Sequence, residues 1–245
     1  MRLAVDGIEL AWEEIGEGAP LLWLHGFMGC GADWPHVFGD APAGCRLLAP
    51  DLPGHGASTG RPGHYSFRKA ADDLVALLDS IHVDRLPVVA LSGGGIVALH
   101  LASSHPERVS RMIVVSAPPR FPDQARAIQR VFSEARLPPE EQARMRQRHT
   151  RQGQIALLVE QTRGFADGDD PDFTAAELAR ITADTLIVFG DRDPFYPVSI
   201  ACELRTAIPR SWLWVVPNGG HGPIFGALAP QFRETAWRFL RGEWS

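Results

Sequence analysis

A serine lies between an apolar run and a glycine-rich segment. Residues 88–96 read VVALSGGGI, so Ser92 follows an expected strand and precedes an expected helix. A serine on such a sharp, strained turn presents its hydroxyl clear of both elements, provided that the residues two before and two after it are small. Those residues are Ala90 and Gly94. A glycine-rich turn with an ordinary N-cap serine explains this pattern equally well. A phosphate-binding loop does not, because no Gly-Lys-Ser/Thr follows.

An acid and a histidine follow two later apolar runs. Residues 186–197 (LIVFGDRDPFYP) carry Asp191 and Asp193 after an expected strand, and residues 218–222 (NGGHG) place His221 after the last one. Each could be an ordinary turn residue when considered alone. Loops at the carboxyl ends of parallel strands converge on one crevice, however, so these groups are expected to meet Ser92. Serine, histidine and aspartate together are the groups that nucleophilic catalysis by a hydroxyl requires.

The elements that must position these groups are short strands alternating with helices. A helical stripe spans residues 66–82, an almost wholly apolar helix is expected over 96–102, and a last helix ends near residue 240. The first two strands are expected to form a hairpin that turns at Asp6-Gly7. This alternation predicts an α/β fold with a mostly parallel central sheet flanked by helices. The expected strands are 2–5, 8–15, 21–25, 46–49, 87–91, 111–116, 185–189 and 212–216.

One segment interrupts this alternation. Residues 119–172 begin at a Pro-Pro pair, are divided by a second pair at 138–139, and contain amphipathic helical pieces. One piece is expected to place Ile128, Val131, Phe132 and Ala135 on one face. We therefore predict a core formed by residues 1–118 and 173–245, with 119–172 inserted as a helical cap. A Thr174-x-x-Glu177 capping box is expected where the chain re-enters the core.

Further motifs resemble those of the α/β-hydrolase-fold superfamily, in particular its small, cap-bearing serine esterase/lipase-like members. They are residues 22–29 (LWLHGFMG) and 51–58 (DLPGHGAS), together with the turn at Ser92, where Ala90 replaces the usual first glycine of G-x-S-x-G. The resemblance covers about 1–118 and 173–245. It implies a fold with the triad order Ser, Asp, His.

The resemblance also assigns roles within the site. It implies that Ser92 is the nucleophile and His221 the general base. The family acid lies three residues after a strand-ending glycine and four before a proline, which selects Asp193, with Asp191 as the fallback. The backbone N–H groups of Phe27 and Gly93 are expected to form the oxyanion hole. His25 and His55 are then interpreted as structural residues.

These assignments predict a cofactor-independent serine hydrolase that cleaves a small carboxylic ester or related acyl substrate through an acyl-enzyme, without a metal. The alternatives on the same scaffold are a carbon–carbon-bond hydrolase, an enol-lactonase, an elimination enzyme of menaquinone biosynthesis, or a small-ligand sensor without turnover. Epoxide hydrolases and haloalkane dehalogenases of this fold need an aspartate where Ser92 stands. Eight arginines lie between residues 118 and 151. They could bind a carboxylate-bearing substrate, although solvated helix faces are the simpler explanation.

Composition limits the remaining classes. The 245 residues are 45% hydrophobic and 22% charged with a net charge of −5, which fits a globular domain and disfavours nucleic acid as a partner. Three cysteines without a C-x-x-C pair fit neither a disulfide framework nor a zinc site. No run of 18 apolar residues or signal-peptide pattern occurs, so we expect a cytoplasmic protein without a membrane span. The sequence makes no prediction of the oligomeric state.

Overall fold

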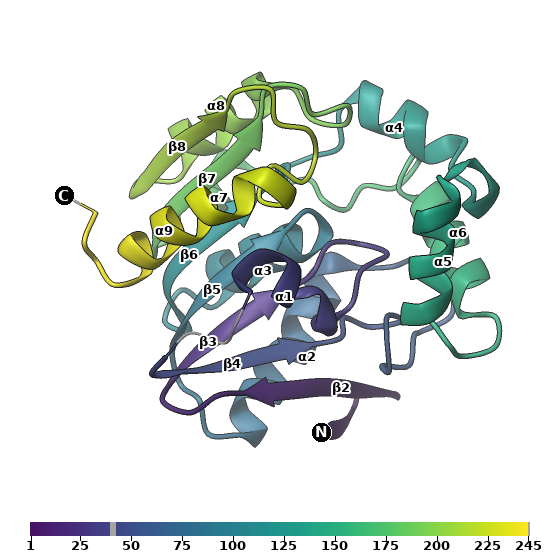
Figure 1. Cartoon of the computed structure of the whole chain (residues 1–245), viewed down its shortest axis with the longest axis horizontal. Helices are drawn as coiled ribbons and strands as arrows, with labels where there is room; N and C mark the ends of the chain where they lie inside the picture. Colours follow the sequence, from purple (N-terminus) through teal and green to yellow (C-terminus); the bar gives the residue numbers. More distant parts are fainter. Residues whose placement is uncertain (40–42, 245) are drawn as a thin grey trace.

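The computed structural model describes residues 1–39 and 43–244, in which eight strands form one sheet (Figure 1). The strand order is β1-β2-β4-β3-β5-β6-β7-β8. The pairs β1–β2 and β2–β4 are antiparallel, and all other neighbours are parallel. The predicted α/β fold with a mostly parallel sheet is therefore confirmed. The strands are β1 (Arg2–Val5), β2 (Ile8–Ile15), β3 (Ala19–Leu24), β4 (Cys45–Pro50), β5 (Leu86–Leu91), β6 (Val109–Val115), β7 (Asp184–Gly190) and β8 (Ser211–Val216).

The first two strands form the expected hairpin. Val5 pairs with Ile8, and the two residues between them, Asp6 and Gly7, have φ values of 40° and 78°. Two successive positive φ angles are typical of the tight turn whose twist matches that of the flanking strands. An Asp-Gly pair supplies this conformation at low cost, which is why the sequence identified the turn.

Side chains that alternate along the strands form an apolar layer on each face of the sheet. Leu22 and Leu24 of β3 pack in the cluster that contains α2, α3 and α8, whereas Leu21 and Trp23 pack with α1 and α9. Figure 1 shows α1 and α9 on the near side of the sheet. The helices of the two layers are α1 (Pro35–Phe38), α2 (Phe67–Ser80), α3 (Gly93–Ser104), α7 (Ala175–Leu178), α8 (Val198–Ala207) and α9 (Ala229–Leu240), with short 3₁₀ turns η1 (Gly31–Asp33) and η3 (Gly226–Leu228).

Three further helices and a 3₁₀ turn connect β6 to β7. They are α4 (Asp123–Arg130), η2 (Glu134–Arg136), α5 (Pro139–Arg148) and α6 (Gln154–Gly164). The helices lie together to one side of the sheet in Figure 1. The expected capping box after this segment is present, with Thr174 Oγ1 accepting the Glu177 N–H and Glu177 Oε2 accepting the Thr174 N–H. The domain boundaries at 119 and 172 stay a prediction, and Ser245 lies outside the described residues.

Two helix expectations need correction. The face expected over 128–135 is wrong, because α4 ends at Arg130 and Val131 is 50% exposed. The Phe132 N–H bonds to the Gln129 carbonyl in a turn that ends the helix. The helix expected from residue 96 begins instead at Gly93. Glycine disfavours helices, so its three-residue run hid the first turn from sequence reasoning. In the described ranges, no helix is both long and apolar enough to span a membrane.

Candidate active site

The turn between β5 and α3 holds Ser92 in a strained conformation. Its backbone has φ 50° and ψ −116°, and its N–H donates to the Val115 carbonyl of β6 at 2.8 Å. For a residue with a side chain such a positive φ costs on the order of 1–3 kcal/mol. The turn fits only because Gly94 lacks a side chain, since a Cβ there would lie 2.4 Å from the His25 carbonyl oxygen. The small residue expected two positions after the serine is thus required by contact with the end of β3.

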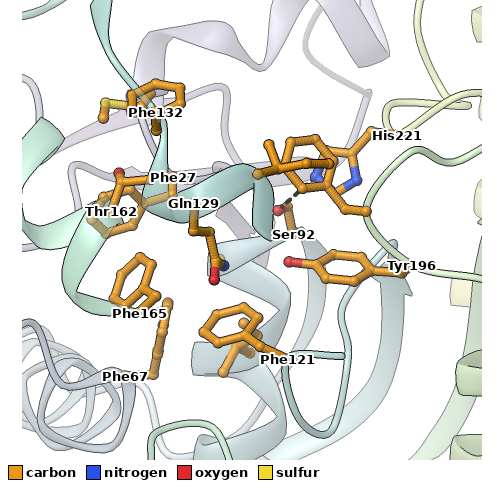
Figure 2. Close-up of a pocket in the computed structure, with 15 residues that line it drawn as sticks. Phe27, Phe67, Ser92, Phe121, Gln129, Phe132, Thr162, Phe165, Tyr196 and His221 are labelled. Atoms are coloured by element: carbon orange, nitrogen blue, oxygen red, sulfur yellow. Dashed lines mark hydrogen bonds between the residues drawn. The ribbon is translucent and has the colours of Figure 1, made fainter. Parts of the chain in front are cut away.

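Ser92, His221 and Asp193 form one chain of hydrogen bonds. Ser92 Oγ lies 2.9 Å from His221 Nε2, and His221 Nδ1 lies 2.9 Å from Asp193 Oδ2. Figure 2 shows the imidazole of His221 beside the Ser92 hydroxyl. The Asp193 side chain is fully buried, whereas Asp191 is exposed and has no side-chain hydrogen bond within the described residues. The structure therefore brings Asp193, and not the fallback Asp191, to the histidine.

Local backbone and aromatic contacts fix the acid and the imidazole. Asp193 Oδ1 accepts the N–H groups of Phe195 at 2.8 Å and Tyr196 at 3.2 Å, which leaves Oδ2 for His221. The rings of Phe195 and Tyr196 lie 4.7 and 5.3 Å from the imidazole centroid. A neutral imidazole that donates from Nδ1 to the carboxylate keeps its Nε2 lone pair free. That lone pair can take the Ser92 proton.

Two backbone donors lie beside the serine. A Cβ on Gly93 would lie 3.1 Å from the Phe27 backbone nitrogen, so the two peptide segments are in close contact. Gly93 is the first residue of α3, and the N–H groups of a first helical turn have no acceptor within the helix. Within the described part of the chain the Phe27 N–H also lacks an acceptor. Two unused donors next to a nucleophile can stabilise an oxygen that gains negative charge.

Three other histidines, His25, His55 and His149, form a buried group that we call the histidine cluster. The His25 and His55 ring centroids are 5.1 Å apart, and those of His55 and His149 are 5.9 Å apart. His25 Nε2 accepts the Leu52 N–H at 3.0 Å, and His149 accepts the Gly56 N–H at 3.1 Å. Burial lowers the pKa of all three imidazoles. These contacts join loops, in agreement with the structural interpretation of His25 and His55.

A cavity of about 150 Å³ opens beside Ser92 and His221 (Figure 2). Its walls are mostly aromatic and aliphatic, and within the described structure they include no Lys, Arg, Asp or Glu. Figure 2 shows the Tyr196 hydroxyl directed toward Ser92. Burial and the neighbouring Asp193 raise the pKa of this phenol, which keeps it protonated. The lining residues are Phe27, Met28, Phe67, Ser92, Gly93, Ile96, Phe121, Ile128, Gln129, Phe132, Thr162, Phe165, Phe195, Tyr196 and His221.

Most of this lining was not predicted from the sequence. Gln129 and Thr162 come from α4 and α6, which carry no motif that indicates a site. Tyr196 lies three residues after Asp193, so its place in the predicted acid loop was the one available signal. Among residues 1–39 and 43–244, no three His, Cys, Asp or Glu side chains are grouped so that they could hold a metal ion.

Seven of the eight arginines in residues 118–151 form hydrogen bonds or ion pairs outside the cavity. Arg126 donates to the carbonyls of Phe165, Ala166 and Gly168, and Arg148 pairs with Asp33. None of the eight lines the cavity of the described structure. Their contacts favour a structural role over recognition of a carboxylate. Those with hydrogen bonds or ion pairs are Arg120, Arg126, Arg130, Arg144, Arg146, Arg148 and Arg151.

Comparisons with known proteins agree with this geometry. A family model described as the alpha/beta hydrolase fold matches residues 19–135. The chain is 29% identical to a 2-hydroxymuconate semialdehyde hydrolase of Pseudomonas sp. (strain CF600), covering 90% of this chain and 86% of that protein. It is 27% identical to a pimeloyl-[acyl-carrier protein] methyl ester esterase of Nitrosomonas europaea, covering 86% of this chain and 92% of that protein.

Solved structures agree as well. A thermophilic esterase from Thermogutta terrifontis superposes with a TM-score of 0.77 at 25% identity, covering 99% of this chain and 98% of that one. The relatives are named for hydrolase and esterase activities, which supports hydrolase activity for this protein. By its sheet and this structural neighbour, the chain has the α/β-hydrolase fold, and its residues 19–135 match the family model of that description.

Proposed function

We propose that this protein is a serine hydrolase that cleaves a small, neutral carboxylic ester or related acyl compound. The proposal is carried by one observation, the continuous chain from the Ser92 hydroxyl through His221 to Asp193 with two 2.9 Å contacts. The adjoining Phe27 and Gly93 N–H groups give it further support. No single one of these groups would be informative alone.

The proposed mechanism follows from the directions of these hydrogen bonds. Ser92 attacks the carbonyl carbon while His221 Nε2 takes its proton, and the imidazolium then returns that proton to the leaving alcohol. Asp193 holds the Nδ1–H tautomer and stabilises the imidazolium without becoming protonated. The Phe27 and Gly93 donors bind the oxyanion of each tetrahedral intermediate, and loss of one such donor typically costs about 10²–10³ in turnover. Water activated by His221 then hydrolyses the acyl-enzyme.

The size and lining of the cavity suit a small, neutral acyl or alcohol group of the substrate. Its volume of about 150 Å³ is comparable to an apolar cavity that admits benzene. A carboxylate buried there would lose its hydration without gaining a cationic partner, which is strongly unfavourable. One relative is named for the carboxylate 2-hydroxymuconate semialdehyde. Because such a charged substrate does not suit this cavity, we favour ester hydrolysis over carbon–carbon-bond hydrolysis for this protein.

The test combines turnover with active-site labelling. We expect continuous release of p-nitrophenol from the acetate and butyrate esters by the wild-type protein, and background release by Ser92→Ala. A fluorophosphonate probe should label only the wild type. Equal labelling of both proteins would refute Ser92 as the nucleophile. At most one slow turnover per molecule would favour a ligand sensor, and turnover confined to lactones or dienoate ketones would favour the alternative hydrolases.

A further inference from the structure

Gln129 is a polar side chain without a protein partner inside the cavity beside Ser92. It lies one residue before the end of α4, is 5% exposed, and is one of the lining residues. Figure 2 shows its amide pointing into the cavity, toward the region of Phe121 and Phe165. Its buried Oε1 has no hydrogen-bond partner in the described parts of the chain. An amide oxygen left unpaired in apolar surroundings destabilises a fold unless something else binds it.

Other buried glutamines of the same segment show what a structural glutamine does here. Gln154 donates from Nε2 to the carbonyls of Gly54 and Gly56, both at 2.9 Å, and accepts the Arg151 N–H at Oε1. Gln161 also has an Oε1 without a partner among the described residues, but its Nε2 donates to the carbonyl of Gly63 at 3.3 Å. Both side chains therefore join the segment to core loops. Gln129 makes no side-chain hydrogen bond to any described residue, so it has no comparable structural role.

We propose that Gln129 is a specificity-determining residue that hydrogen-bonds a hydroxyl or N–H group of the substrate. The buried unpaired atom is the acceptor Oε1, so the group that satisfies it must be a donor. The NH₂ group of the same amide also makes no hydrogen bond to a described residue, so a hydroxyl, which can both donate and accept, suits this amide best. The aromatic walls around it suit a planar or short apolar body, and the lack of charged lining residues in the described structure suits a neutral one. The substrate class is therefore a neutral acyl or alcohol group that carries a donor at a distance from the scissile carbonyl.

This inference rests on the proposed ester hydrolysis, and it can be tested with substrates that differ only at the distal group. The p-nitrophenyl esters of phenylacetate, 3- and 4-hydroxyphenylacetate, and 4-methoxyphenylacetate suit this purpose. The methylene group insulates the ester carbonyl from the ring substituent, and rates with hydroxide correct for any remaining difference. The methoxy compound has a similar size and an oxygen, but no donor.

We expect wild-type kcat/KM to be about three- to tenfold higher for at least one hydroxylated ester than for the phenylacetate ester. This ratio corresponds to the usual net contribution of one neutral hydrogen bond. The methoxy ester should show no such gain. Gln129→Leu should remove the preference, whereas Gln152→Leu should keep it, because Gln152 is an exposed glutamine of the same segment. An equal rate for hydroxylated and unsubstituted esters, or a preference that survives in Gln129→Leu, would overturn the inference.

A binding measurement separates this inference from the proposed function. In Ser92→Ala, which cannot turn over, p-cresol should bind about three- to tenfold more tightly than toluene, and the added Gln129→Leu change should abolish the difference. If the wild type hydrolyses no ester but this binding difference is found, the proposed function fails and the role of Gln129 stands. If esters are hydrolysed but neither assay depends on Gln129, the role of Gln129 alone fails.

Discussion

Replacing Asp193 by asparagine tests whether the carboxylate sets the protonation state of His221. Asp193 Oδ1 accepts two backbone N–H groups, from Phe195 at 2.8 Å and Tyr196 at 3.2 Å. In Asp193→Asn the amide oxygen must occupy that position, because the amide NH₂ group cannot accept hydrogen bonds. The NH₂ group then faces His221 Nδ1, which has to act as an acceptor. The imidazole proton is thereby placed on Nε2, and His221 can no longer receive the Ser92 proton.

The size of the effect follows from the same contacts. Rotating the amide to restore the productive tautomer would break both backbone hydrogen bonds, at about 1 kcal/mol each, and leave buried donors unpaired. A cost of at least about 2 kcal/mol leaves only a few per cent of the molecules in the productive arrangement. The loss of the negative charge beside the imidazolium lowers the rate further. We expect kcat to fall by about 10³–10⁴, or roughly 4–5.5 kcal/mol of transition-state stabilisation.

The assay is hydrolysis of p-nitrophenyl butyrate, with thermal unfolding to show that the variant is folded. Asp191→Asn is the matched control, because Asp191 is exposed two residues away and its change should alter kcat by less than about twofold. If Asp193→Asn keeps more than a tenth of the wild-type activity while folded, the tautomer reasoning is wrong. A large loss in Asp191→Asn with little loss in Asp193→Asn would identify the other aspartate as the catalytic acid.

Three further predictions concern stability. Ser92→Gly should unfold about 2–4 °C above Ser92→Ala, because both lack the hydroxyl but only glycine is unstrained at φ 50°; equal melting temperatures would refute strain at this turn. Gly94→Ala should lower the free energy of unfolding by about 1–3 kcal/mol, because its Cβ would lie 2.4 Å from the His25 carbonyl oxygen. Gly220→Ala, with open space around its Cβ, should be close to neutral in the same urea titration. The histidine cluster, whose pKa values are lowered on folding, takes up protons on unfolding, so stability should be complete above about pH 6.5 and fall as the pH drops below it. Urea unfolding at pH 5, 6 and 7 should show a smaller loss for His149→Gln, and an equal loss would contradict this assignment.

Local patterns in the sequence were sufficient to predict the sheet and the order of the candidate catalytic residues. A buried parallel strand appears in the sequence as a short apolar run, and an Asp-Gly turn or a capping box involves only a few consecutive residues. Each can therefore be recognised without knowing which distant segments pack against it. Ser92 could be selected because it directly follows β5, and His221 because it lies in the loop after β8, the last strand. The glycine run at 93–95 shows the limit of this reasoning, since helix propensity alone hid the start of α3.

Only the tertiary structure shows how these groups meet. The family spacing selects Asp193 over Asp191, and the structure gives the physical reason, because the backbone N–H groups of the loop bind one carboxylate oxygen and turn the other toward His221. The cavity is assembled from segments more than a hundred residues apart, among them Phe27 and Gln129. Whether a glutamine in an amphipathic helix bonds to a core loop or faces a cavity depends on its packing partners, which local periodicity does not specify. The sequence by itself therefore determined the scaffold and the order of the candidate triad, and packing between distant segments determined the shape and polarity of the space beside it.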